Sequence, residues 1–506
     1  SYWEFHKWSV ENYTDFWGEL WHYFGIISSR TYDKVFLKTG NGFLDHEWFS
    51  GATFNFAENI LRIRDNRTAL ICADEFGNDE MVTFAEMFNE VKLYAAAFRK
   101  HGLRVGDRVA CYMSNRKEAV FAMLATASIG AVWSGPLPYY GARAASNIVN
   151  MMEPKFLIAV DHFQDNGNQF HPIDNLSAIA DSTPCLQKVI IIPTREDTFT
   201  RDLSDIRNSI LLEDFLQTGR NPDGLVPDIV FEQLPFNHPI CINFTSGTTG
   251  LPKGPVHSAG TLIPVLRDFA FHLNMKSGDI VFSLFPVGWS LWDYPISSLA
   301  LGVKIFLYNG SPYYNRKGSN IWDIFSQYKV SFAFLATTMV DKLEKEKIAP
   351  TPGSNFDSLK VIGIGGSPVK RQNFEYLHST VKKDLFVGSM YVHQMEELQD
   401  YLCVGQDGCD GDTRAVLFVK LKKGYTFTPQ LREKIANLIN RELWEDYVPQ
   451  VIMEVPDIPY NLNNKRMESL VRRIVATNTV PEVMNIKNPD CLQHFCDIPE
   501  LVNYKK

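Results

Sequence analysis

The chain has 506 residues, of which 45% are hydrophobic and 21% are charged, and its formal net charge is −8. This length exceeds that of one ordinary domain and favours two to four domains. The composition is that of a globular protein with a sizeable core. The acidic balance excludes a nucleic-acid binder that works through bulk positive charge, and it is more typical of a surface charged for solubility.

The cysteines indicate the compartment of the protein. There are eight, and none forms a C-x-x-C pair. Cys491 and Cys496 flank His494, but no second ligand pair accompanies them, so we expect no metal site. Scattered cysteines are typical of a reducing compartment, and we predict a cytosolic location. No apolar run reaches the length of a membrane span, and no signal peptide is visible. Because the chain begins at Ser1, a targeting segment ahead of it stays open.

The first 60 residues are rich in aromatic side chains. The spacing of Phe16, Leu20, Tyr23 and Phe24 predicts a helix over residues 11–24 whose apolar stripe packs into the core.

From about residue 67 the pattern alternates between short apolar runs and amphipathic segments. Helices are predicted over residues 84–100 and 118–127. Buried strands are predicted over 68–72, 81–84, 105–113, 130–133, 156–160, 188–193, 240–244, 279–285, 304–308, 331–335 and 359–364. Strands that alternate with helices predict an α/β fold of parallel sheets flanked by helices.

The last part of the chain has a different pattern. Strands over 403–405 and 414–421 surround an acidic, glycine-containing turn at 407–412, which is more typical of a solvated turn than of a metal site. A helix over 428–444 is capped by Thr428 with Pro429 at its first position. A strand over 451–455 and a helix over 466–476 complete a small α+β unit. We therefore predict a large domain over 1–389 and a small domain over 390–506.

One ten-residue segment carries the strongest chemical signal. It reads Thr245-Ser246-Gly247-Thr248-Thr249-Gly250-Leu251-Pro252-Lys253-Gly254. Glycines let the backbone approach a ligand, successive N–H groups form an anion nest, and the hydroxyls and the lysine add donors and charge. The ordinary P-loop is excluded because no Ser or Thr follows Lys253 directly. A plain turn would not need these side chains, so we predict a polyphosphate site.

This loop is similar to the signature loop of the AMP-forming acyl-CoA synthetases, the adenylate-forming superfamily. Further segments resemble the acetoacetyl-CoA synthetase branch and cover both ends and most of the middle of the chain. They are residues 6–12, 48–61, 152–155, 288–294, 308–312, 365–368 and 458–465.

The resemblance implies a ligase with small-molecule substrates and no nucleic-acid partner. ATP and a short acid would give an acyl-adenylate and pyrophosphate, and coenzyme A would then displace AMP. Mg²⁺ would accompany the nucleotide. Acetoacetate as the acid rests on the resemblance alone, and propionate or another short acid stays open. The oligomeric state is not indicated.

The resemblance also implies roles for individual residues. Thr245, Ser246, Gly247, Thr248, Thr249, Gly250 and Lys253 would hold the β- and γ-phosphates, and Gly366, Ser367 and Pro368 would lie along the nucleotide. Lys465 would contact the acyl carboxylate and the α-phosphate during adenylation, the alternative being a solvated surface lysine. Trp289 would form a wall of the acyl pocket, the alternative being ordinary core packing. No metal ligand is assigned.

The chain departs from the family pattern after Ser389. A Gly-Gly-Thr-Asp-like motif, a Gly-Asp ribose contact and a hinge arginine are not found, and on the order of a hundred residues are expected to be missing between 389 and 390. Two interpretations follow. The chain is a shortened acetoacetyl-type synthetase with little or no turnover, or it is a relative that acts as a nucleotide-binding or regulatory protein.

Overall fold

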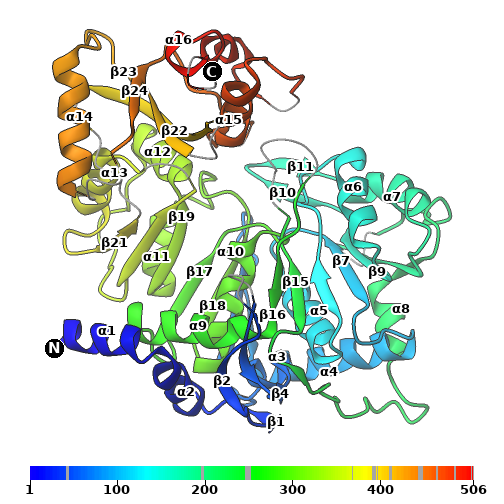
Figure 1. Cartoon of the computed structure of the whole chain (residues 1–506). Coiled ribbons are helices and arrows are strands. Elements are labelled where there is room, and N and C mark those ends of the chain that lie inside the picture. The colour runs from blue at the N-terminus through cyan, green and yellow to red at the C-terminus, as the bar shows by residue number, and fades with distance from the viewer. Residues whose placement is uncertain are drawn as a thin grey trace.

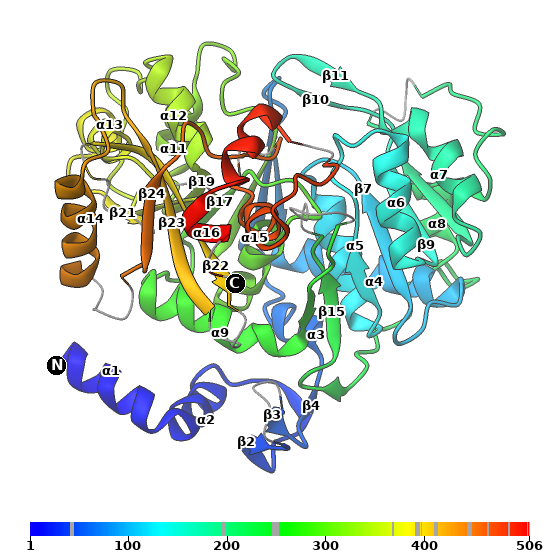
Figure 2. The same cartoon turned by 45° about the horizontal axis from the view of Figure 1, so that its top comes forward.

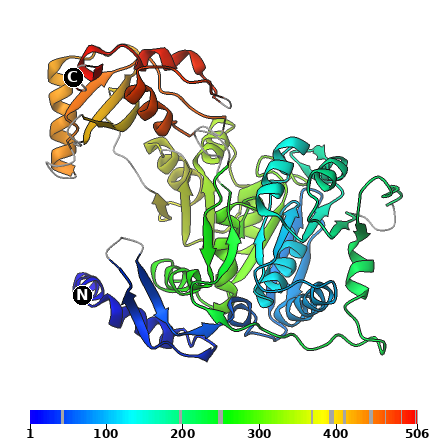
Figure 3. The same cartoon turned by 45° about the vertical axis from the view of Figure 1, so that its right-hand side comes forward.

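The computed structural model describes residues 1–40, 45–194, 199–244, 252–366, 369–389, 395, 397–408, 413–442, 448–462, 465–483, 486–502 and 504. A large body contains two seven-stranded sheets that lie side by side, with helices on their faces (Figure 1). A small unit with its own three-stranded sheet stands above this body and carries the C-terminus (Figure 3).

The first large sheet has the strand order β13-β12-β9-β7-β8-β15-β16. All of its strands are parallel to their neighbours except the edge strand β16. The bounds are β7 Arg108–Tyr112, β8 Val132–Ser134, β9 Phe156–Val160, β12 Lys188–Ile192, β13 Ser209–Leu211, β15 Pro239–Ile242 and β16 Val256–Ser258.

Helices cover both faces of this sheet. Val109 and Cys111 belong to the same hydrophobic cluster as α4 (Phe84–Lys100) and α5 (Lys117–Ser128). Ala110 and Tyr112, which point the other way, pack with α6 (Ala142–Met152) and α7 (Leu176–Ser182). Because both faces are buried, the strands appear in the sequence as continuous apolar runs, which is why they could be predicted.

The second large sheet has the order β21-β20-β19-β17-β18-β5-β6, and only β6 runs antiparallel to its neighbour. The strands are β5 Thr68–Asp74, β6 Glu80–Thr83, β17 Ile280–Ser283, β18 Lys304–Asn309, β19 Phe332–Ala336, β20 Val361–Gly365 and β21 Phe386–Ser389. The helices α11 (Ile321–Tyr328), α12 (Thr337–Lys345) and α13 (Arg371–Tyr376) share a core with one face. The predicted α/β fold of parallel sheets is confirmed.

Shorter elements complete the large body. Near the N-terminus they are β1 Ser28–Arg30, β2 Lys34–Lys38, β3 His46–Ser50, β4 Thr53–Phe54 and α3 Phe56–Ile60. Later in the chain they are β10 Phe163–Asp165, β11 Asn168–Phe170, α8 Leu212–Gln217, β14 Leu234–Pro235, α9 Leu262–Arg267 and α10 Ser290–Asp293.

The N-terminal helices correct one expectation. The predicted helix is α2 (Tyr13–Tyr23), and Leu20 and Phe24 are buried as expected. Tyr23, however, is 68% exposed, and its ring contacts that of Phe271, also exposed, edge to face at a centroid separation of 5.2 Å. The preceding helix α1 (Tyr2–Glu11) buries none of its residues and projects away from the body (Figure 2).

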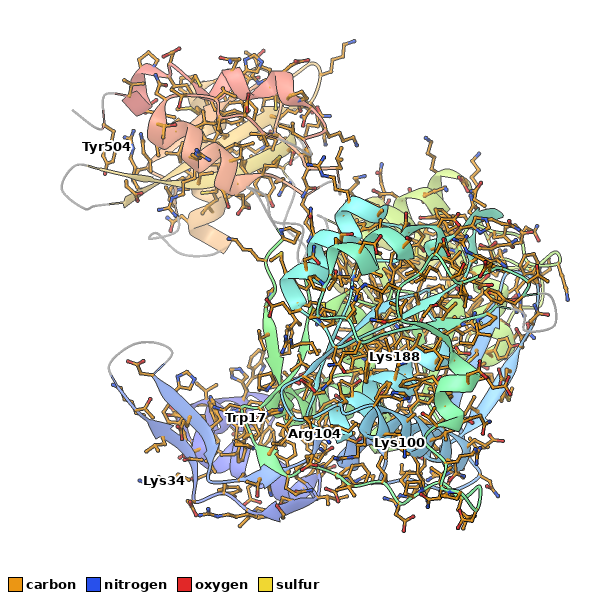
Figure 4. The ribbon with its side chains drawn as sticks, turned by 90° about the vertical axis from the view of Figure 1, so that its right-hand side faces the viewer. Trp17, Lys34, Lys100, Arg104, Lys188 and Tyr504 are labelled. Atoms are coloured by element: carbon orange, nitrogen blue, oxygen red, sulfur yellow. The ribbon has the colours of Figure 1, made fainter. Side chains whose placement is uncertain are left out.

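The N-terminal segment meets the large body at Trp17 (Figure 4). The guanidinium of Arg267, the last residue of α9, lies 5.1 Å from the centre of the Trp17 ring. Such a cation–π contact fixes α2 against α9.

The small unit contains β22 (Leu398–Asp407), β23 (Thr413–Leu421) and β24 (Val451–Glu454) in that order. Its helices are α14 (Pro429–Glu442), α15 (Glu468–Thr477) and α16 (Pro499–Val502). The Thr428 hydroxyl accepts a hydrogen bond from the backbone N–H of Leu431 at 3.2 Å, so the predicted cap is confirmed. The division at residue 389 stays a prediction, since residues 390–394 lie outside the described part. In that described part, every helix is too short or too polar to span a bilayer.

Asn55 is a buried hydrogen-bonding centre of the large body. The residue is 2% exposed. Its side-chain amide donates to the carbonyls of Ala127, Ser128 and Glu232 at 3.1, 3.2 and 2.8 Å. Its Oδ1 accepts from the backbone N–H of Glu58. Asn55→Ala would leave these groups unpaired, and we expect it to lower the free energy of unfolding by about 2–4 kcal/mol.

Urea unfolding followed by tryptophan fluorescence measures this loss. The matched control is Asn78→Ala, at an exposed residue whose side-chain amide donates to Asp74 at 2.8 Å, and we expect a change within about 0.5 kcal/mol. Equal losses in the two variants would contradict the role given to Asn55.

Candidate active site

The carboxyl ends of the two large sheets meet at Asn115, three residues after β7. Its amide Nδ2 donates to the carbonyl of Ser283 at 2.8 Å and to that of Tyr308 at 3.3 Å, which belong to β17 and β18 of the other sheet. Its Oδ1 accepts from the indole Nε1 of Trp292 at 2.8 Å. Ligands of open parallel sheets bind beyond these strand ends, so the junction is where a site is expected.

A second contact joins the same two sheets. Gly288 follows β17 with a φ of +91°, and a Cβ at this position would lie 2.6 Å from the carbonyl oxygen of Gly135, which follows β8. Only glycine permits both this conformation and this approach. The loop that carries Trp289 is therefore pressed against the loop after β8.

The predicted phosphate loop joins β15 to β16 at the same end of the first sheet. Residues 245–251, including Thr245, Ser246, Gly247, Thr248, Thr249 and Gly250, lie outside the described residues. Lys253 is described and exposed, close to the start of β16. The loop thus leaves the carboxyl end of a parallel strand, which is the position that a phosphate loop needs.

The predicted nucleotide segment follows β20 of the second sheet. Gly366 is exposed and has a φ of +92°, so the chain turns sharply as β20 ends, while Ser367 and Pro368 lie outside the described residues. The Thr337 hydroxyl donates to the carbonyl of Gly365 at 3.1 Å and fixes the end of this strand to α12.

The structure brings Lys465 and Trp289 together. The Lys465 ammonium lies 5.3 Å from the centre of the Trp289 ring, within the range of a cation–π interaction. Trp289 is half-buried rather than enclosed in the core, and Lys465 is half-buried too. Two residues that were singled out separately in the sequence, one from each unit, therefore meet at the junction of the sheets.

The backbone of Lys465 is held in a tight turn between β24 and α15. Its N–H donates to Oδ1 of Asn461 at 3.0 Å, and its carbonyl accepts from the N–H of Asn461 at 2.9 Å. Tyr460 and Arg466 pair as an antiparallel bridge at the base of this turn. The bridge explains why α15 begins at Glu468 rather than at the predicted residue 466.

Asp293 is a buried carboxyl that the sequence reasoning missed. Both of its oxygens are shielded from water and accept no hydrogen bond of full geometry within the described part of the chain, although the side chains of Asn243 and Cys241 are close enough to act as weak donors. Burial raises the pKa of Asp293 to about 6. Hydrogen bonding from the side chains of Asn243 and Cys241, at the end of β15, lowers the pKa, but this effect is smaller than that of burial. The feature of the sequence that could have indicated Asp293 is its place as the one acidic residue in the otherwise uncharged segment 288–294.

Metal binding is not indicated by the described side chains. Among them, no group of three or more histidine, cysteine, aspartate or glutamate residues is arranged to hold an ion. The seven cysteines of the described part are free.

Two family models match the chain. The model described as "AMP-binding enzyme" matches residues 56–391, and the model described as "Acetyl-coenzyme A synthetase N-terminus" matches residues 2–60. The first covers more than half of the chain and contains every strand of both large sheets.

Full-length relatives agree with these matches. An acetoacetyl-CoA synthetase of Gallus gallus is 31% identical, covering 100% of this chain and 94% of the relative. That of Mus musculus is 32% identical, covering 100% and 93%. Among solved structures, an acetoacetyl-CoA synthetase from Streptomyces lividans matches with a TM-score of 0.74 and 25% identity over 97% of this chain and 93% of that one.

The relatives are longer than this chain. The alignment with the Gallus gallus protein extends over 631 positions against 506 residues here, so that relative carries residues without a counterpart in this chain. The place of the missing residues, expected between 389 and 390, stays a prediction.

The buried Asp293 carboxyl makes stability depend on pH. Its folded pKa of about 6 lies above the value of about 3.9 for an unfolded chain, so the folded state binds the proton more tightly. The stabilising contribution of that proton is full below about pH 4 and is lost as the pH rises through 6. At pH 8 Asp293→Asn should therefore stabilise the protein by about 2–3 kcal/mol.

Thermal and urea unfolding at pH 8, 6 and 4 measure this effect. We expect the gain from Asp293→Asn to shrink as the pH falls through 6. The control Asp181→Asn, at an exposed aspartate, should show no such trend. A gain that stays constant over the three pH values would argue against a buried, ionised Asp293.

Proposed function

Since the chain belongs to the acetoacetyl-CoA synthetase family of AMP-binding enzymes, which join acids to coenzyme A, we propose that its acid is acetoacetate. The products would be acetoacetyl-CoA, AMP and pyrophosphate. The relatives named above are acetoacetyl-CoA synthetases, and this supports the choice of acid for this chain.

The observation that carries the proposal is the approach of Lys465 to Trp289. The Lys465 ammonium lies 5.3 Å from the centre of the Trp289 ring, and Trp289 is on the loop that follows the carboxyl end of β17. This is a position from which one cation can reach both an acid and a nucleotide.

In the first half-reaction a carboxylate oxygen of the acid attacks the α-phosphorus of ATP. The new C–O–P linkage forms as the bond to pyrophosphate breaks. Charge gathers on the phosphoryl oxygens, and Lys465 would hold the acid and the α-phosphate together through charged hydrogen bonds. Such positioning contributes most of the catalysis in reactions of this type.

The phosphate groups would be held by the loop after β15. We assign the β- and γ-phosphates to Thr245, Ser246, Gly247, Thr248, Thr249, Gly250 and Lys253, and the flank of the nucleotide to Gly366, Ser367 and Pro368. Backbone N–H groups and hydroxyls suit these anions because they donate without adding bulk.

In the second half-reaction the thiol of coenzyme A attacks the acyl carbon. The thioester bond forms and AMP leaves with the electrons of the C–O bond.

Trp289 would limit the acid to a short chain, because its ring lies beside Lys465, which binds the carboxylate. Mg²⁺ would neutralise phosphate charge, and in sites of this kind it is held largely by phosphate oxygens and water.

We also propose a division of the chain into two domains and a location for the protein. We assign the phosphate loop and Trp289 to a large domain over 1–389 and Lys465 to a small domain over 390–506. The free cysteines of the described part support a cytosolic location. The named relatives give no support to the alternative of an inactive nucleotide-binding or regulatory protein.

Activity on a panel of acids tests the proposed function directly. With ATP, Mg²⁺ and coenzyme A, we expect AMP to form with acetoacetate at a kcat/KM at least about tenfold above that for propionate or hexanoate. Equal rates with all acids would contradict the choice of acetoacetate. If AMP does not form with any acid while calorimetry shows that ATP binds, the nucleotide-binding alternative replaces the ligase.

Lys465 should be needed for one half-reaction only. Lys465→Ala is expected to lower acid-dependent exchange of pyrophosphate into ATP by about 10²–10³-fold, since a charged donor to the transition state is lost. Conversion of preformed acetoacetyl-adenylate to the thioester should stay within about twofold, because the adenylate already contains the bond that Lys465 helps to form.

The matched control is Lys423→Ala, at an exposed lysine of the small unit, which should leave both half-reactions unchanged. A parallel loss of both half-reactions in Lys465→Ala would place the lysine outside the adenylation chemistry.

A further inference from the structure

Asp400 is a buried carboxylate in the small unit, on strand β22, and it is 8% exposed. Its Oδ1 accepts two hydrogen bonds from the guanidinium of Arg466, from Nε at 2.9 Å and from Nη2 at 2.6 Å. Its Oδ2 accepts from the hydroxyl of Tyr460. One carboxylate thus binds two residues that are far from it in the sequence.

These two partners form the base of the turn that carries Lys465. Tyr460 and Arg466 are paired with each other as an antiparallel bridge, and the N–H of Met467 donates to the carbonyl of Pro459 at 3.0 Å. Asp400 therefore holds both arms of the turn at once. A residue carried on a turn that is held on both arms has few ways to shift, and Lys465 is such a residue.

One further contact and the burial of the charged pair make this arrangement stiff. The guanidinium of Arg466 lies over the ring of Tyr401, the residue after Asp400, at 4.4 Å from its centre. The side chains of Arg466 and Asp400 are 16% and 10% exposed, so little water competes for their charges. Burial and the Asp400 charge raise the pKa of Tyr460 to about 12, so its hydroxyl keeps its proton and stays a donor.

We propose that Asp400 is a positioning residue that sets, through Arg466 and Tyr460, where the ammonium of Lys465 stands over Trp289. The inference rests on the proposed role of Lys465 in adenylation. It adds a specific consequence, which is that a group remote from the substrates controls the first half-reaction and leaves the second one alone.

Geometry makes this consequence measurable. The Lys465 side chain reaches from the small unit to Trp289 of the large body, so a small tilt of the turn displaces its end. A displacement of about 1 Å at a reacting group can cost about 10²-fold in rate. For stability alone, a buried ion pair is often no better than apolar residues of similar volume, so a purely structural role would not require this network.

The experiment compares three variants of the full chain. Asp400→Asn removes the charge at constant shape, Tyr460→Phe removes one donor, and Asp407→Asn is the matched control. Asp407 also lies on β22 and bonds an arginine, Arg472 at 3.2 Å, but it is 57% exposed and remote from the turn. We expect Asp400→Asn to lower pyrophosphate exchange about 10–100-fold and Tyr460→Phe about threefold to tenfold.

In both variants the thioester half-reaction should stay within about twofold, and Asp407→Asn should change neither step. Equal losses in both half-reactions of Asp400→Asn would show a general structural role and overturn the proposal. Unchanged pyrophosphate exchange in Asp400→Asn would overturn it as well.

A second measurement does not depend on turnover. Brief labelling with an amine-reactive ester, followed by mass spectrometry of the peptide that contains Lys465, reports how firmly the ammonium is held. We expect labelling of Lys465 to be at least about threefold faster in Asp400→Asn than in the unchanged chain, and unchanged in Asp407→Asn. An unchanged rate in Asp400→Asn would overturn the inference even if the ligase is active. Faster labelling in a chain that activates no acid would support the inference while the proposed function fails.

Discussion

The side chain of Asn115 lies where the carboxyl ends of the two large sheets meet, and the geometry of the site depends on the hydrogen bonds it forms there. Its amide donates to Ser283 and Tyr308 of one sheet from a loop of the other, and it accepts from the buried indole of Trp292. An unpaired amide or carbonyl at this depth would be costly. The two sheets are therefore fixed in one relative position, and the loops that follow their strands are brought to one place.

Charge at this junction is distributed unevenly. Asp293 is buried with only the weak donors Asn243 and Cys241 near it within the described part of the chain, whereas the ammonium of Lys465 reaches the same region from the small unit. Buried groups with strongly shifted pKa values are concentrated at functional sites, because binding and catalysis need pKa values that differ from the ordinary ones. Asp400 differs in this respect, since its charge is paired with Arg466 and its two oxygens accept hydrogen bonds from Arg466 and Tyr460.

The N-terminal segment differs from the rest of the large body in that many of its apolar side chains are exposed. The helix α1 presents Trp3, Phe5 and Val10 to solvent at 74%, 53% and 60% exposure, although a helix so rich in apolar side chains ordinarily packs on its neighbours. The family model that matches residues 2–60 places this segment within the family. Aromatic content alone could not tell which of these rings are core, and Tyr23 shows that helical spacing could not either.

The sequence by itself determined the regular part of the molecule. Strands such as β9 and helices such as α4 were predicted with the bounds that they have, because a strand buried on both faces and an amphipathic helix each leave a local pattern. The phosphate loop could also be singled out, because its chemistry is concentrated in ten residues, and Lys465 was singled out through the resemblance of residues 458–465 to the family. What only the tertiary structure decided is which distant groups meet. The approach of Lys465 to Trp289, the joining of the sheets by Asn115 and the clamp of Asp400 on Arg466 each link residues more than sixty positions apart, and no local pattern of apolar and polar residues encodes such pairings.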